Sequence, residues 1–153
     1  MTFTFQISEN SSKHVEPILR ALPEWFGIEE STAQYVKDAD TMTTMLAKDG
    51  NDVIGFITIH HHFPETAEIH CMGILPKYHR TGTGKLLVKA IEDYLKKEGV
   101  KFLQVKTVSE GNPDKAYLKS REFYKGVGFT PLEVFPTLWD EWNPCLLLVK
   151  SLS

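Results

Sequence analysis

A short segment near the middle of the chain, YHRTGTGKLL at residues 78–87, has the residue types of an anion-binding loop. Basic residues precede two glycines, Gly82 and Gly84, and a helix-like segment follows them. The first backbone N–H groups of a helix lack internal partners and lie at the positive end of the helix dipole. Because glycine has no Cβ, an anion can approach those groups closely. A tight strand-to-helix turn with solvated charges is the alternative, and the loop alone leaves both open.

Two known nucleotide-binding patterns do not fit this loop. A Walker A loop needs a glycine five positions before the Gly-Lys pair and Ser or Thr after the lysine. Those two positions hold His79 and Leu86. A dinucleotide fingerprint needs a third glycine where the chain has Leu87. Both mismatches argue against a Walker A loop and a dinucleotide-binding loop.

A second group of chemically competent residues lies in the strand-like segments before the loop. Glu68 and His70 are two residues apart, so on a strand they share a face, and either could accept a proton or simply line a wall. The run His60, His61 and His62 suggests a metal site, but adjacent strand residues point to opposite faces. Only the first and third could converge, and no cysteine or carboxylate set completes a tetrahedral site. We therefore expect no metal.

Hydrophobic periodicity predicts the elements that must hold these residues. Helices are expected from residue 10 or 11 to about 23, and over 28–39, 84–98 and about 113–126. Strands are expected over 2–8, in a hairpin over 41–61, and over 67–75, 101–108, 129–135 and 144–152, with a loop over 136–143. This order predicts an α/β fold: a mixed sheet with helices on both faces.

Composition narrows the function classes. The 153 residues are 42% hydrophobic, which suits one domain over 1–153 with its own core. The net charge of −3 gives no electrostatic signature of nucleic-acid binding and favours a cationic ligand slightly. Cys71 and Cys145 lie in apolar segments and are expected to be buried, reduced thiols. With no signal-peptide pattern and no membrane-length apolar run, we expect a soluble, cytoplasmic protein without a membrane partner.

The glycine loop fits a wider pattern. The segment MGILPKYHRTGTGKLL (72–87) resembles the acetyl-CoA-binding motif of the GNAT superfamily of N-acetyltransferases, and REFYKGVGF (121–129) resembles a second signature of that family. The resemblance covers roughly residues 40–150. It departs from the usual pattern at His79, where Gln or Arg is common, and at Tyr117 and Ser120, where many members have Asn and Ala.

The resemblance implies a fold and a reaction. The fold is a mostly antiparallel mixed sheet, splayed between the fourth and fifth strands, with Gly73 permitting a bulge. The reaction is direct transfer of an acetyl group from acetyl-CoA, the cosubstrate, to the primary amine of a small acceptor, without a metal. A non-catalytic acyl-CoA-binding module or sensor is the alternative, and a homodimer is possible.

The resemblance also assigns residues. Tyr124 matches the general acid that protonates the leaving thiolate, and Glu68 or His70 is the candidate base. The coenzyme-binding positions are Met72, Gly73, Ile74, His79, Arg80, Thr81, Gly82, Thr83, Gly84 and Lys85. Aromatic and acidic residues at 24–30 and 139–142 suit a cationic amine, and equally suit a core and a solvated surface.

Overall fold

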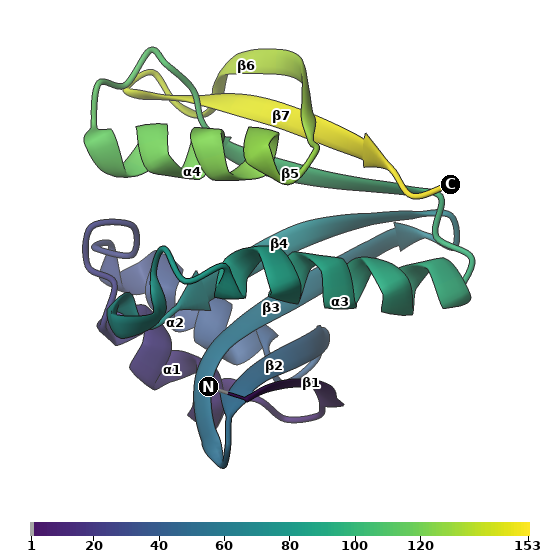
Figure 1. The fold of residues 1–153 in the computed structure, drawn as a ribbon. Helices are drawn as coiled ribbons and strands as arrows, with labels where there is room; N and C mark the ends of the chain where they lie inside the picture. Colours follow the sequence, from purple (N-terminus) through teal and green to yellow (C-terminus); the bar gives the residue numbers. More distant parts are fainter. Residues whose placement is uncertain (1) are drawn as a thin grey trace. The chain divides into compact units, whose positions relative to one another are not determined.

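The computed structural model describes residues 2–153. The elements follow the order expected from the sequence: β1 (Phe3–Ser8), α1 (Ser12–Arg20), α2 (Glu29–Asp38), β2 (Thr43–Asp49), β3 (Asp52–Phe63), β4 (Thr66–Ile74), a 3₁₀ turn (Pro76–Tyr78), α3 (Thr83–Lys97), β5 (Phe102–Val108), α4 (Lys115–Gly126), β6 (Thr130–Asp140) and β7 (Asn143–Ser151) (Figure 1).

The strands form a seven-stranded sheet in the order β1-β2-β3-β4-β5-β7-β6. The pairs β1–β2, β2–β3, β5–β7 and β6–β7 are antiparallel, and β4–β5 is parallel. A mixed, mostly antiparallel sheet is therefore confirmed. The chain divides into two compact units, one holding His70–Leu95 and the residues before His61, the other His61–Ile69 and Lys96–Ser153. The expectations of a single domain and of a splay between β4 and β5 stay predictions.

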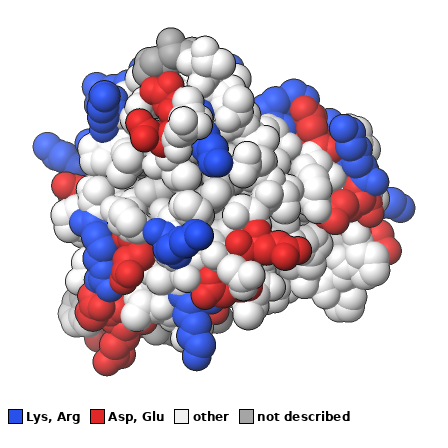
Figure 2. All heavy atoms as spheres, turned by 90° about the horizontal axis from the view of Figure 1, so that it is seen from below, with Lys and Arg blue, Asp and Glu red and all other residues white. Residues whose placement is uncertain are grey.

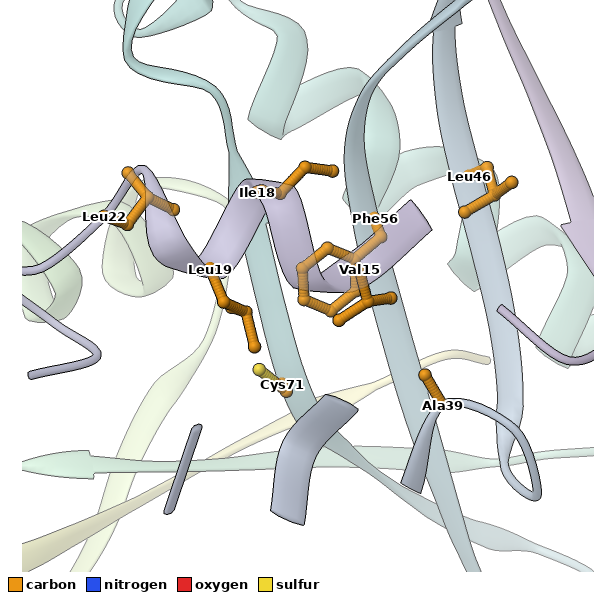
Figure 3. Close-up of a cluster of buried hydrophobic side chains, with 8 residues drawn as sticks. All are labelled: Val15, Ile18, Leu19, Leu22, Ala39, Leu46, Phe56 and Cys71. Atoms are coloured by element: carbon orange, nitrogen blue, oxygen red, sulfur yellow. The ribbon is translucent and has the colours of Figure 1, made fainter. Parts of the chain in front are cut away.

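The core of the first unit forms around β3. Six consecutive residues, Ile54–Ile59, are buried, which requires cover on both faces of the strand. Apolar side chains of α1 pack on one face, against Phe56 of β3 and Cys71 of β4 (Figure 3). Gly73 belongs to this contact, because a Cβ there would lie 3.1–3.3 Å from Leu22, Ile18 and Phe56. Close packing of α1 thus accounts for this glycine.

The second unit contains the three-stranded arrangement β5-β7-β6 and α4. The segment 136–140, expected to be a loop, is part of β6, which runs to Asp140. The Asp140 side chain accepts hydrogen bonds from the backbone N–H groups of Trp142 and Asn143, both at 2.9 Å. This tight turn lets β6 and β7 pair up to Asp140 and Asn143. The register shifts between Phe135 and Asp140, which accommodates the additional residues of β6.

Two properties of the described residues bear on possible partners. No helix within residues 2–153 is long and apolar enough to cross a membrane. On the face drawn in Figure 2, acidic and basic side chains are interspersed rather than gathered into a surface of one sign.

Candidate functional site

The glycine loop contains two residues in the left-handed region of backbone conformation. After the 3₁₀ turn, His79 is extended, Arg80 has φ of 61° and Gly82 has φ of 82°, and α3 begins at Thr83. A positive φ is uncommon for a residue with a Cβ, and such strain is often kept at functional sites. These two conformations make the loop a candidate functional site.

Side chains inside the loop hold that shape. The Thr81 hydroxyl donates to the Tyr78 carbonyl at 2.6 Å and lies 2.7 Å from the Thr83 hydroxyl. His79 Nε2 is 2.7 Å from the Ile74 carbonyl, which can only accept, so this nitrogen carries the hydrogen. A neutral ring with its hydrogen on Nε2 has no second N–H to offer a phosphate oxygen. Its role in this conformation is to close the turn.

The groups left for a ligand are backbone amides. The N–H of Leu86 bonds to the Gly82 carbonyl at 3.1 Å, so the N–H groups of Thr83, Gly84 and Lys85 precede the first helical bond of α3. A Cβ built on Gly82 meets no heavy atom within 4 Å. Its φ, not internal packing, requires glycine, and the space in front of the loop is open to an anion.

The loop is anchored to the β2–β3 hairpin by Tyr78. Its hydroxyl donates to Asp49 at 2.8 Å, and its ring meets Phe3 edge-on at a centroid distance of 6.0 Å. The hydrogen bond to Asp49, followed by burial, raises the pKa of Tyr78. Upstream, the Ile74 carbonyl accepts a hydrogen bond from His79 Nε2. The N–H of Leu75 donates to the Ile54 carbonyl at 2.8 Å. Hydrogen bonds to the loop and to β3 thus hold the end of β4, which carries Met72, Gly73 and Ile74.

His70 has a carboxylate partner that the sequence did not reveal. Its Nε2 lies 2.8 Å from Oδ2 of Asp38, the last residue of α2. The His70 ring also meets the rings of Tyr35 and His60 edge-on, at centroid distances of 5.2 and 6.2 Å. Asp38 is 32 residues earlier in the chain, and only the packing of α2 brings it to β4.

Glu68 lies in a different polar cluster. Its Oε1 accepts from His62 Nε2 at 2.7 Å, Gln104 Nε2 at 2.9 Å and Lys106 Nζ at 3.2 Å. Gln104 is its register partner in the parallel β5, and Lys106 lies on the same face two residues later. Burial acts to raise the pKa of Glu68, but the hydrogen bonds from His62 and Gln104 and the charge of Lys106 outweigh it and lower the pKa.

The three consecutive histidines each contact a different residue. His60 meets His70, His61 lies 3.3 Å from Glu98, and His62 bonds to Glu68. Within residues 2–153, no group of three or more His, Cys, Asp or Glu side chains is arranged to hold a metal ion.

Tyr124 occupies the last turns of α4. Its ring meets Phe123 and Phe129 edge-on, at 5.4 and 5.9 Å between centroids, and its carbonyl accepts the N–H of Phe129 at 3.0 Å. Tyr124 and Glu68 belong to the second unit, whereas His70 and the glycine loop belong to the first. Each unit therefore carries part of the residues selected from the sequence, and their catalytic and binding roles stay predictions.

The two cysteines are free and buried, as expected. Burial, and then the charge of Asp38, raises the pKa of the Cys71 thiol. Burial likewise raises the pKa of Cys145. Because the thiolate is the reactive form, neither side chain has the environment of a nucleophile.

Comparisons with known proteins agree with the pattern of the glycine loop. Residues 13–129 match the acetyltransferase (GNAT) family. A mycothiol acetyltransferase from Corynebacterium glutamicum (strain R) is 27% identical over 101 residues, 66% of this chain and 32% of the relative. The match thus spans about a third of that curated relative.

Solved structures share the fold at low sequence identity. A ribosomal-protein alanine N-acetyltransferase from Escherichia coli has a TM-score of 0.76 and 16% identity, with 99% of this chain and 95% of that chain covered. An aminoglycoside 6'-N-acetyltransferase complexed with coenzyme A has a TM-score of 0.74 and 18% identity, with 97% of each chain covered. At these identities the likeness establishes the fold alone, and the two proteins are named for very different acceptors.

Proposed function

The chain belongs to the GNAT family of acetyltransferases, and we propose from this premise that it transfers an acetyl group from acetyl-CoA to the primary amine of a small acceptor. The observation that carries the proposal is the loop at residues 79–85. It combines two residues of positive φ, N–H groups at the start of α3 that precede its first helical hydrogen bond, and open space over Gly82. These features suit a pyrophosphate held by backbone amides.

Residues around the loop complete the coenzyme site in this proposal. The exposed Arg80 and Lys85 add positive charge beside the amides. Backbone groups of β4 at Met72–Ile74 hold the acyl arm, and an N–H there donates to the thioester oxygen. When bound, acetyl-CoA supplies an activated acyl carbon. Within the chain, the buried thiols of Cys71 and Cys145 favour direct attack by the amine over a cysteine-bound intermediate.

Proton transfer is assigned to two side chains, Tyr124 and His70. Tyr124 gives a proton to the departing thiolate, and His70 removes a proton from the acceptor amine. Glu68 stays ionised, because its lowered pKa makes it a weak base and its oxygen Oε1 already accepts three hydrogen bonds.

The turn between β6 and β7 supports an acceptor with a positive charge. Trp139 and Trp142 are 47% and 74% exposed, and the acidic Asp140 and Glu141 lie between them in the chain. Exposed indole faces beside carboxylates attract ammonium groups. We therefore propose a small cationic amine as the acceptor.

Two glycines with equivalent backbones test the coenzyme site. Gly82 and Gly99 both have positive φ, at 82° and 92°, and a Cβ on either meets nothing within 4 Å. We expect Gly82→Ala and Gly99→Ala each to lower the free energy of unfolding by about 1–2 kcal/mol, since each forces a Cβ into the left-handed region. Only Gly82→Ala should also weaken binding of coenzyme A, measured by calorimetry. Equal coenzyme affinity in both variants would remove the loop from the site.

Turnover is tested by thiol release from acetyl-CoA in the presence of a panel of small amines. We expect Tyr124→Phe to lower kcat by roughly 10²–10⁴-fold while coenzyme binding persists, because only the proton donor is lost. Tyr94→Phe, a hydroxyl deletion on α3, is the control. Coenzyme binding by the parent with no thiol release on any amine would identify a non-catalytic acyl-CoA-binding module.

A further inference from the structure

The pair formed by His70 and Asp38 has the geometry of an oriented base. We propose that Asp38 is the positioning residue for His70, holding the hydrogen on Nε2 so that Nδ1 receives the proton of the acceptor's ammonium group. The proton transfer in this inference rests on the proposed function. The orientation of the His70 ring does not, because it follows from contacts within the first unit.

The tautomer follows from the chemistry of the partner. An ionised carboxylate has only acceptor positions, so the imidazole nitrogen 2.8 Å from Asp38 Oδ2 must carry the hydrogen. In a neutral ring the other nitrogen, Nδ1, then holds the lone pair. Hydrogen bonds from His70 to described residues all involve Nε2, so within residues 2–153 Nδ1 has no hydrogen-bonding partner. The side chain is 23% exposed, which leaves the ring accessible.

Asp38 is held in place by a second contact. Gln34, one turn earlier on α2, donates its Nε2–H to Asp38 Oδ1 at 2.8 Å, while Oδ2 takes the imidazole. The Asp38 side chain is 16% exposed, and no Lys or Arg among the described residues forms an ion pair with it. The two oxygens therefore have separate donors, and the negative charge faces His70 without a competing cation.

Other groups around the ring do not compete for the hydrogen on Nε2. Tyr35 on α2 and His60 on β3 meet His70 edge-on, at 5.2 and 6.2 Å between centroids. Cys71, the next residue on β4, is a buried thiol whose pKa is raised by burial and by Asp38. Asp38 is the one carboxylate bonded to the ring among residues 2–153.

The proton balance is simple. The ammonium N–H bond breaks, its electron pair stays on the amine nitrogen, and a new bond forms to Nδ1. His70 becomes an imidazolium whose charge is stabilised by Asp38, and the amine is left neutral for attack. The imidazolium returns this proton to water after transfer. The second proton that the attacking nitrogen loses replaces the one that Tyr124 gives to the thiolate, so no further reactant is needed.

Nitrogen-15 correlation spectra of the imidazole rings test the orientation without any substrate. In the parent, the neutral His70 ring should appear as the Nε2–H tautomer, with its signals assigned by their loss in His70→Gln. In Asp38→Asn the amide can also donate, so we expect a mixture of both tautomers. Asp40→Asn, two residues later, is the control. Asp40 accepts the N–H of Ser12 at 2.9 Å, so the His70 signals of this variant should match those of the parent.

Steady-state kinetics on the same folded variants test the catalytic consequence. Asp38→Asn should lower kcat at least about 10-fold while KM for acetyl-CoA changes little, because the interaction acts on the proton transfer rather than on coenzyme binding. Asp40→Asn should retain the parent kcat. Parent-like tautomer and kcat in Asp38→Asn would overturn the role of Asp38. An Nε2–H tautomer in a parent that releases no thiol with any amine would instead overturn the proposed function.

Discussion

Two histidine–carboxylate pairs have nearly the same hydrogen-bond distance but different surroundings. In the second unit, His62 Nε2 lies 2.7 Å from Glu68 Oε1. In the first unit, His70 Nε2 lies 2.8 Å from Asp38 Oδ2. Glu68 also accepts from Gln104 and Lys106, on the same oxygen. Asp38 takes a neutral amide on one oxygen and the imidazole on the other.

The two pairs differ in the other groups that contact the carboxylate. A lysine beside Glu68 compensates its charge and holds its pKa low, so the carboxylate acts as a fixed anion. Asp38 has no such cation among the described residues, and its charge is directed at the ring of His70. We propose that the first arrangement stabilises the fold, whereas the second prepares a histidine for proton transfer.

The largest effect should separate the two histidines. We expect His70→Gln to lower kcat by roughly 10²–10⁴-fold, because glutamine cannot accept a proton at this position. His62→Gln should leave kcat close to the parent, since glutamine can still donate to Glu68. Thiol release under saturating acetyl-CoA measures both. A greater loss of kcat in His62→Gln than in His70→Gln would reverse the assignment.

An intermediate effect concerns acid stability. A glutamate whose pKa is lowered in the folded state stabilises the fold above its ordinary pKa of 4.5, and this contribution disappears as the pH falls through the lowered value. We expect Glu68→Gln to lower the free energy of unfolding by about 1–3 kcal/mol at neutral pH, since Lys106 loses its counter-charge. Urea unfolding at several pH values measures this.

The pH dependence sharpens that prediction. The difference in stability between the parent and Glu68→Gln should shrink as the pH drops below 4.5, because the parent then also carries a neutral side chain at this position. A difference that stays constant down to strongly acidic pH would mean that packing, not the charge of Glu68, accounts for the loss.

The smallest change in the free energy of unfolding is expected at a third histidine–carboxylate pair, which is a reference for the other two. His61 and Glu98 lie 3.3 Å apart, with side chains 36% and 40% exposed. Solvent screens such pairs, so Glu98→Gln should change the free energy of unfolding by less than about 0.5 kcal/mol. A loss as large as that of Glu68→Gln would show that burial is not what distinguishes these pairs.

Much of the fold was predictable because its signals are local. The apolar face of α3 and the turn glycine of the β2–β3 hairpin indicated the element order that the structure confirms. The exception is the end of β6, where the side chain of Asp140 makes a two-residue turn out of a segment that looks like a loop. Residues 136–140 have a composition that does not reveal this bond.

The candidate site was predictable where it depends on backbone conformation. Gly82 and Gly84 marked a loop at the start of a helix, and the structure adds the positive φ of Arg80 and the inward bond of His79. Asp38 and Lys106 were not found, because each lies more than 30 residues from the side chain that it contacts. Nothing in the segment around either residue indicates such a partner.

By itself the sequence determined the element order, the amide-rich loop and the candidate proton-transfer residues, since periodicity, glycine positions and motif spacing are properties of neighbouring residues. The tertiary structure alone decided which carboxylate faces which histidine. That choice depends on the packing of α2 near β4 and on the register of β4 against β5, which bring together side chains that are distant in the chain.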